Sequence, residues 1–112
     1  MRRLLFVAIA MLAGCGGSGV DGDKLVVELS ESEIDDLCTY IIEQQGGART
    51  EVCMDDDGEF TVEFPDFDEC VDSLSSYVED CPSTVHQEEE CAEKLGDDPC
   101  DDPAACHASD DC

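Results

Sequence analysis

Residues 30–47 of this 112-residue chain read SESEIDDLCTYIIEQQGG. Ser30 and Glu33 form a capping-box pair, and the preceding Leu29 can pack on the first turn as a hydrophobic staple. Five apolar residues then follow at the i, i+3, i+4, i+7 and i+8 positions of one helical face: Ile34, Leu37, Cys38, Ile41 and Ile42. Because two glycines end the pattern, the stretch predicts one amphipathic helix with a buried stripe.

The residues after this helix alternate between apolar and polar side chains, as in a strand. Residues 50–54 and 59–64 flank the sequence Asp55-Asp56-Asp57-Gly58, and an Asp-Gly pair is a strong turn signal between two strands. Phe60, Val62 and Phe64 then share one face of the second strand. We therefore predict a β-hairpin.

Two more helices are predicted from capping pairs that precede apolar residues at helical spacing. Asp66 with Glu69 opens one over residues 66–77, and Thr84 with Gln87 opens a more polar one over 84–95, which Gly96 ends. Before residue 30, alternation over 25–29 predicts a short strand or an extended lead-in. The expected fold is a small, disulfide-rich α+β domain with three short helices, a β-hairpin and an irregular, crosslinked C-terminal tail that contains one helical turn around 104–108.

The chain has nine cysteines. Eight are interpreted as members of structural disulfides: Cys38, Cys53, Cys70, Cys81, Cys91, Cys100, Cys106 and Cys112. No C-x-x-C pair occurs, which argues against thioredoxin-like redox chemistry and against paired-knuckle zinc sites. Carboxylates directly precede several of these cysteines and disfavour the thiolate that a reactive cysteine needs.

Sequence alone leaves many pairings of eight cysteines open. One pair follows from geometry if the helices over 66–77 and 84–95 form an antiparallel hairpin around Cys81-Pro82. Cys70 and Cys91 then lie almost equally far from the bend, on facing helices. We therefore predict a Cys70–Cys91 disulfide.

The N-terminus combines two arginines at positions 2 and 3 with an apolar run over 4–12. This is the architecture of a secretory signal, and the run has about half of the roughly 20 residues that a transmembrane helix needs. The run Leu12-Ala13-Gly14-Cys15 that follows resembles the lipobox of bacterial lipoprotein signal peptides. The resemblance implies a signal peptide over 1–14 and a lipid on Cys15. Gly16 in the next position is compatible with transport to the outer membrane.

In length, cysteine number and the placing of Thr84-Val85 ahead of Glu90-Cys91, the chain is also similar to small cysteine-rich bacterial lipoproteins without an assigned activity. The glycine-rich residues 15–23 lack apolar periodicity and read as a flexible tether. Residues 24–112 are then the disulfide-stapled acidic domain, exported into the cell envelope and lipid-anchored to a membrane, with the outer membrane favoured. That location supplies the oxidising conditions that disulfides require.

The large negative charge of the chain limits which kinds of molecule can bind to it. Cleavage before Cys15 leaves three basic residues, Lys24, Arg49 and Lys94, against all 30 acidic ones, a formal net charge of −27. Such a polyanion repels nucleic acid and anionic lipid. Apart from the membrane reached through the lipid, the expected partners are a basic protein, a polycation or divalent cations.

Other candidate sites have simpler explanations. Asp55, Asp57 and Gly58 invite comparison with a calcium loop, but that register puts Cys53 and Phe64 at ligand positions, and the turn explains Asp57-Gly58. His86 and Glu90 lie one helical turn apart without further ligands, and both histidines, His86 and His107, are interpreted as solvated surface residues. No nucleophile elbow or phosphate loop occurs.

We therefore expect a non-enzymatic interaction or structural module without a cofactor, catalytic residues or a specific metal site. A low-affinity divalent-cation (calcium) binding lipoprotein is the alternative. The acidic clusters that could bind such cations weakly are Asp55–Asp57, Asp66 with Asp68 and Glu69, Glu88–Glu90, and Asp97-Asp98 with Asp101-Asp102.

Overall fold

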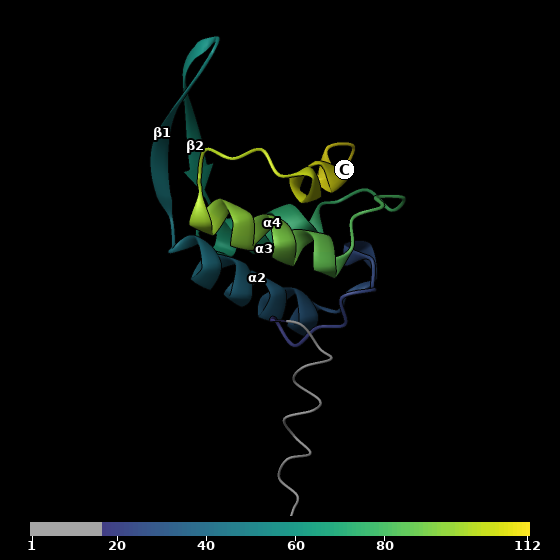
Figure 1. The fold of residues 1–112 in the computed structure, drawn as a ribbon. Helices are drawn as coiled ribbons and strands as arrows, with labels where there is room; N and C mark the ends of the chain where they lie inside the picture. The colour runs from purple at the N-terminus through teal and green to yellow at the C-terminus, as the bar shows by residue number, and fades with distance from the viewer. Residues whose placement is uncertain (1–16) are drawn as a thin grey trace, which may run out of the picture.

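A computed structural model describes residues 17–112, so the expected signal peptide over 1–14 and Cys15 lie outside the described residues. Within 17–112 the fold is α+β, as predicted, with three α-helices, a two-stranded antiparallel sheet and two short 3-10 helices (Figure 1). The elements in chain order are η1 (Val26–Glu28), α2 (Glu31–Gln45), β1 (Arg49–Asp55), β2 (Gly58–Phe64), α3 (Phe67–Ser75), α4 (Val85–Asp97) and η2 (Ala104–Ser109).

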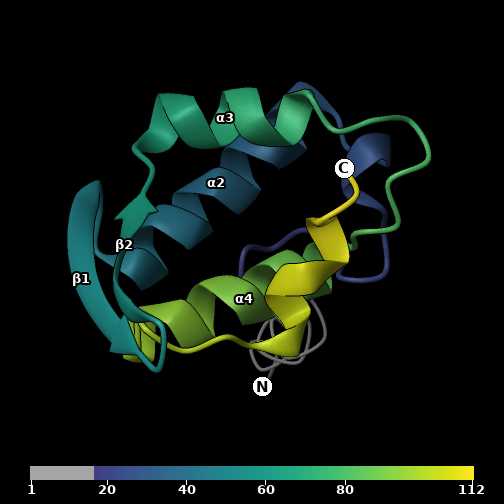
Figure 2. The ribbon, with the colours of Figure 1, turned by 90° about the horizontal axis from the view of Figure 1, so that it is seen from above.

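Helix α2 is the centre of the packing. It lies between α3 and α4 and packs against both (Figure 2). Its stripe supplies much of the core, since Leu37 and Cys38 are completely buried and Ile34 and Ile41 nearly so. The other helices bury shorter faces against it, Cys70 and Leu74 from α3 and Val85 and Ala92 from α4.

All three predicted capping boxes are present. The Ser30 hydroxyl accepts from the backbone N–H of Glu33 while the Glu33 carboxylate accepts from the N–H of Ser30. Asp66 with Glu69 and Thr84 with Gln87 repeat this exchange at α3 and α4. These local bonds satisfy N–H groups that have no partner inside a helix, which is why the helix starts could be predicted from sequence.

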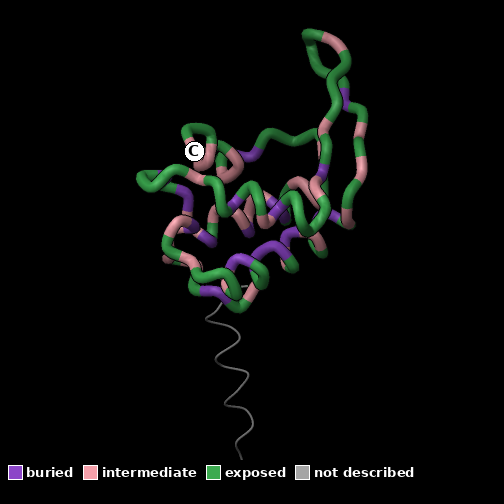
Figure 3. The backbone as a smooth tube through the Cα atoms, turned by 180° about the vertical axis from the view of Figure 1, so that it is seen from behind, coloured by how far each residue is buried: buried purple, intermediate pink, exposed green. Residues whose placement is uncertain are grey.

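The predicted hairpin is confirmed, with Asp55 opposite Gly58 at the turn and Cys53 opposite Phe60. At the turn the N–H of Asp57 donates to the Asp55 carboxylate, 2.8 Å away, and Gly58 has a positive φ of 122°. The β-hairpin extends away from the helices, and the residues near its turn are exposed (Figure 3). Phe64 at its base is buried.

The eight cysteines form four disulfides, Cys38–Cys70, Cys53–Cys100, Cys81–Cys112 and Cys91–Cys106. The predicted Cys70–Cys91 pair is wrong. It assumed that α3 and α4 form a hairpin, whereas each packs on its own side of α2 and residues 76–84 span the distance (Figure 2). Cys70 therefore meets α2, and Cys91 meets the C-terminal tail.

Two expectations about the N-terminal segment are corrected. Residues 25–29, expected as a short strand or an extended lead-in, contain the 3-10 helix η1 between the extended residues Leu25 and Leu29, with one isolated antiparallel bridge between Leu25 and Thr84. The expected tether over 15–23 is packed along its described part, because Val20 is only 3% exposed and belongs to the core cluster. The folded domain therefore begins ahead of Lys24.

The C-terminal tail forms the predicted helical turn, η2, which lies along α4 (Figure 1). Cys91–Cys106 joins the tail to α4, and Cys81–Cys112 joins its end to the connection between α3 and α4. Crosslinks of this kind compensate for a segment with little apolar surface to bury.

Candidate functional site

A groove of about 700 Å³ runs along η1 between the first turn of α2 and the end of α3. Seven of its lining residues are apolar or aromatic: Leu25, Val26, Val27, Leu29, Ile34, Leu74 and Tyr77. A smaller hollow of about 240 Å³ shares Glu31, Ile34 and Ser75 with it and extends toward Val71 and Asp35. The two hollows adjoin at these shared residues and are together called the η1 groove here.

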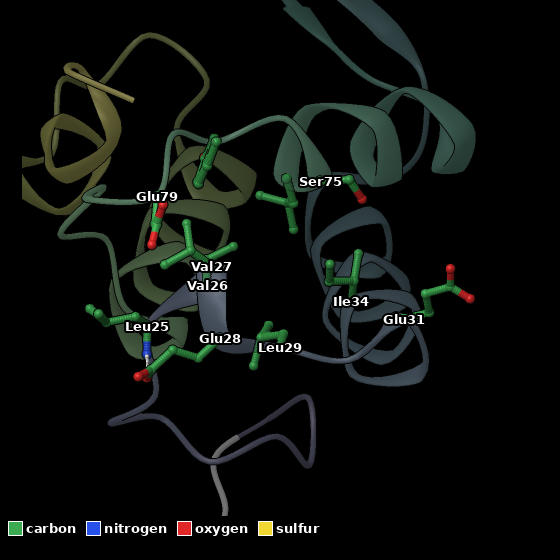
Figure 4. A pocket seen from close by; sticks show the side chains of 11 residues that line it. Leu25, Val26, Val27, Glu28, Leu29, Glu31, Ile34, Ser75 and Glu79 are labelled. Atoms are coloured by element: carbon green, nitrogen blue, oxygen red, sulfur yellow. Dashed lines mark hydrogen bonds between the residues drawn. The ribbon is translucent and has the colours of Figure 1, made fainter.

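Three carboxylates surround this depression. Glu28, Glu31 and Glu79 lie around the apolar side chains of Val27, Leu29 and Ile34 (Figure 4). All three acids are exposed, and neither lysine nor arginine lines the groove. A floor of hydrocarbon with an acidic rim matches an apolar side chain flanked by cationic ones.

The backbone of η1 holds the floor in place. Val26 is 1% exposed, and its N–H donates to the carbonyl of Ser83 over 2.9 Å. The N–H of Val85 in turn donates to the carbonyl of Lys24, also over 2.9 Å. These bonds fasten both sides of Leu25 to the start of α4, and Val27 and Leu29 then line the groove together with Ile34.

The rest of the surface offers few free cationic groups. Lys24 is paired with Glu33 at 3.0 Å, Arg49 with Glu51 at 2.8 Å, and Lys94 with Glu90 at 3.8 Å. The Arg49 guanidinium also lies 4.7 Å from the centre of the Phe64 ring. Every lysine and arginine within residues 17–112 is therefore already engaged with an acid, and the excess of carboxylates remains available to a partner.

Glu89 is the most deeply buried acid, with 3% exposure. Its carboxylate accepts from both the backbone N–H and the hydroxyl of Ser18. Glu88–Glu90 were expected to act as one acidic cluster, and the burial of Glu89 was not predicted from sequence. The helical spacing of Val85, Glu89 and Ala92 was the available signal, since i, i+4 and i+7 share a face.

A second polar cluster lies beside the groove. Glu88 accepts from the Tyr77 hydroxyl at 3.0 Å and from the Ser83 hydroxyl at 2.7 Å. Burial, and then the negative charge of Glu88, raises the pKa of Tyr77, so this phenol stays protonated. Ser83 is completely buried. It therefore supports the groove wall and is no accessible nucleophile.

The two histidines have different acidic partners. His86 approaches Glu90 at 3.5 Å, as the helical spacing suggested. His107, expected as a solvated surface residue, is half exposed and lies between Asp110 at 2.8 Å and Asp102 at 2.6 Å. The hydrogen bond to Asp110, and then that to Asp102, raises the pKa of His107.

Within the part of the chain that the structure describes, no group of three or more histidine, cysteine or acidic side chains is placed to hold a metal ion. The Asp55–Asp57 run at the hairpin tip makes turn contacts instead.

No helix among residues 17–112 has the length and apolarity to cross a membrane. Comparison with protein-family models, with curated proteins and with solved structures found no match.

Proposed function

We propose that this chain is an exported bacterial lipoprotein, held to a membrane through Cys15, whose acidic domain binds a basic and partly apolar segment of another protein. The acidic rim around the η1 groove is the observation that carries the binding proposal. Binding, without catalysis, is the activity that we assign to the domain.

The chemistry of the groove defines the partner. An apolar side chain that leaves water for the floor gains about 25 cal/mol per Å² of buried area. Lysine or arginine residues on either side of it would then face Glu28, Glu31 and Glu79. The large negative charge of the whole domain speeds the approach of such a segment and repels acidic competitors.

The disulfides support the proposed location. Four of them indicate a non-cytoplasmic, oxidising compartment. The lipid anchor itself rests on the lipobox resemblance around Cys15. Intact mass of the protein purified from membranes tests it: we expect cleavage before Cys15 and added acyl mass, and a Cys15→Ala chain that is released from the membrane fraction. An unlipidated mass in the membrane fraction would contradict the anchor.

A calorimetric titration tests the groove. The probe is a peptide with two leucines flanked by lysines, and the protein is the full lipoprotein in detergent. Glu28→Gln/Glu79→Gln removes two rim charges, while the amide oxygen of a glutamine at position 28 can still accept from the N–H of Leu25, as Glu28 does over 3.1 Å. We expect the affinity to fall about tenfold, since each local ion pair is worth roughly 0.2–1 kcal/mol.

The matched control is Glu59→Gln/Glu63→Gln, which removes the same charge from the hairpin. It should weaken binding less than about twofold, because only long-range attraction is lost. Equal losses in the two double variants would reject the groove as the binding site. If calcium alone raises the melting temperature at millimolar levels and the peptide does not bind, the cation-binding alternative is correct.

A further inference from the structure

We infer that the domain sits directly on the bilayer surface in one orientation, with the face around Ser18, Tyr40 and Glu93 toward the lipid headgroups and the hairpin tip away from them. This inference rests on the proposed lipid at Cys15. It replaces the picture of a domain that tumbles at the end of a flexible tether. Three contacts of the N-terminal segment carry it.

The first contact is polar. The buried Glu89 carboxylate accepts from the Ser18 N–H at 2.9 Å and also from the Ser18 hydroxyl. The same hydroxyl accepts from the N–H of Val20 at 3.2 Å, which closes the turn. Releasing Ser18 would leave a buried carboxylate without its donors, and such groups are expensive to leave unpaired.

The second contact is apolar. Val20 is 3% exposed and packs in the same core cluster as Leu37 and Val85. Val20 lies two residues after Ser18. The N-terminal segment is therefore fixed to the domain at two positions, by the hydrogen bonds of Ser18 and by the burial of Val20. Next along the chain, the N–H of His86 donates to the carbonyl of Gly22 at 3.0 Å.

The third contact brings the domain surface closest to Cys15. A Cβ added at Gly17 would overlap the Tyr40 ring, so the Gly17 backbone lies directly on that ring. The Tyr40 hydroxyl donates to Glu93 on α4. Burial, and then this carboxylate, raises the pKa of Tyr40 to about 12, so the phenol remains a donor at neutral pH.

The length of the backbone between Cys15 and Ser18 limits how far the domain can lie from the lipid. Cys15 is three residues from Ser18, and three residues span at most roughly 10 Å. A lipid on Cys15 is fixed at the bilayer surface, so Tyr40 must lie near headgroup level. The hairpin rises from the opposite side of the helices and points away from this end of the chain (Figure 1).

Fluorescence of single tryptophans tests the orientation, because the chain has no tryptophan of its own. The reporters are Tyr40→Trp on the proposed lipid-facing side, with Glu93→Trp as a second variant there, and Phe60→Trp on the hairpin. Each lipoprotein is placed in phosphatidylcholine vesicles in which a fraction of the headgroups carries a nitroxide quencher. We expect quenching of the reporters at positions 40 and 93 to be several-fold stronger than quenching of the reporter at position 60.

Insertion of ten glycine and serine residues between Gly16 and Gly17 is the matched control. It leaves the contacts of Ser18 and Val20 in place and should lower quenching in the Tyr40→Trp variant to the level of the Phe60→Trp variant. Equal quenching at all three positions without the insertion, in protein that carries lipid and floats with vesicles, would overturn the orientation alone. Absence of lipid mass together with absence of vesicle binding would overturn the anchor as well.

Discussion

At the residue scale, Glu88, Glu89 and Glu90 show how one chemistry takes three roles. Successive residues of a helix point about 100° apart, so the three carboxylates leave α4 on different sides. Glu88 accepts from Tyr77 and Ser83, Glu89 is buried against Ser18, and Glu90 faces His86 and Lys94. Helical phase alone predicts that one of them is buried. It does not predict the partner, because Ser18 is distant in sequence.

His107 gives a prediction at the same scale. Its pKa in the folded protein is raised by Asp110 and Asp102 above the ordinary value near 6.5. The stabilisation by protonated His107 is therefore fully present at pH values below about 6.5, the pKa of histidine in the unfolded chain. It is lost as the pH rises through the higher pKa of His107 in the folded protein. The melting temperature of the wild type should exceed that of His107→Gln at about pH 5, and the gap should close by about pH 9.

Thermal melting of both proteins across that range measures the effect, and the difference between them cancels the many other titrating carboxylates. A gap that widens with rising pH would contradict the bridged His107. Direct titration of the imidazole protons by NMR would locate the pKa itself.

At the scale of elements, the starts of the helices could be predicted from sequence, whereas the packing of one helix against another could not. Capping pairs act within four residues, so the starts of α2, α3 and α4 followed from sequence. The mutual placement of α3 and α4 did not. Both gain most by covering the apolar stripe of α2, and this shared preference decided against the expected helical hairpin and the Cys70–Cys91 pair.

Gly96 shows the same difference and gives an element-scale prediction. Sequence suggested that it ends the helix, yet α4 continues to Asp97, and a Cβ at position 96 would overlap the Gln44 carbonyl oxygen of α2. Alanine in place of a helical glycine ordinarily stabilises by roughly 0.5–1 kcal/mol. Here we expect Gly96→Ala to destabilise by about 1–3 kcal/mol, because α4 must move away from α2.

Denaturant unfolding of Gly96→Ala measures this, with Asp97→Ala as the control at the adjacent, exposed position. The control should change the free energy of unfolding by less than about 0.5 kcal/mol. If Gly96→Ala stabilises the protein instead, the close approach of the two helices is wrong.

At the scale of the whole molecule, one crosslink holds the hairpin to the body. A two-stranded ribbon is marginally stable alone, and the outer face of this one exposes Val52 and Met54. Cys53–Cys100 joins β1 to the tail over a sequence separation of 47. The disulfide therefore restrains a ribbon that buries little beyond Phe64 and Cys53.

Removing this disulfide as Cys53→Ala/Cys100→Ala should lower the free energy of unfolding by about 4 kcal/mol on the loop-entropy estimate. Amide hydrogens of β1 and β2 should exchange faster. The control is Cys91→Ala/Cys106→Ala, which opens a separation of only 15 and should cost about 3 kcal/mol while hairpin exchange stays nearly unchanged. Equal hairpin protection in both double variants would contradict the restraint.

The amino-acid order by itself determined the local features of this protein. Helix starts, the Asp-Gly turn and the use of eight cysteines in disulfides depend on neighbours in the chain or on composition, so they were predictable. Only the tertiary structure decided which cysteines pair, that Glu89 finds its partner in Ser18, and that apolar residues of η1 meet α3 beneath an acidic rim. These features join residues far apart in sequence, and packing around α2, which no local pattern encodes, brings them together.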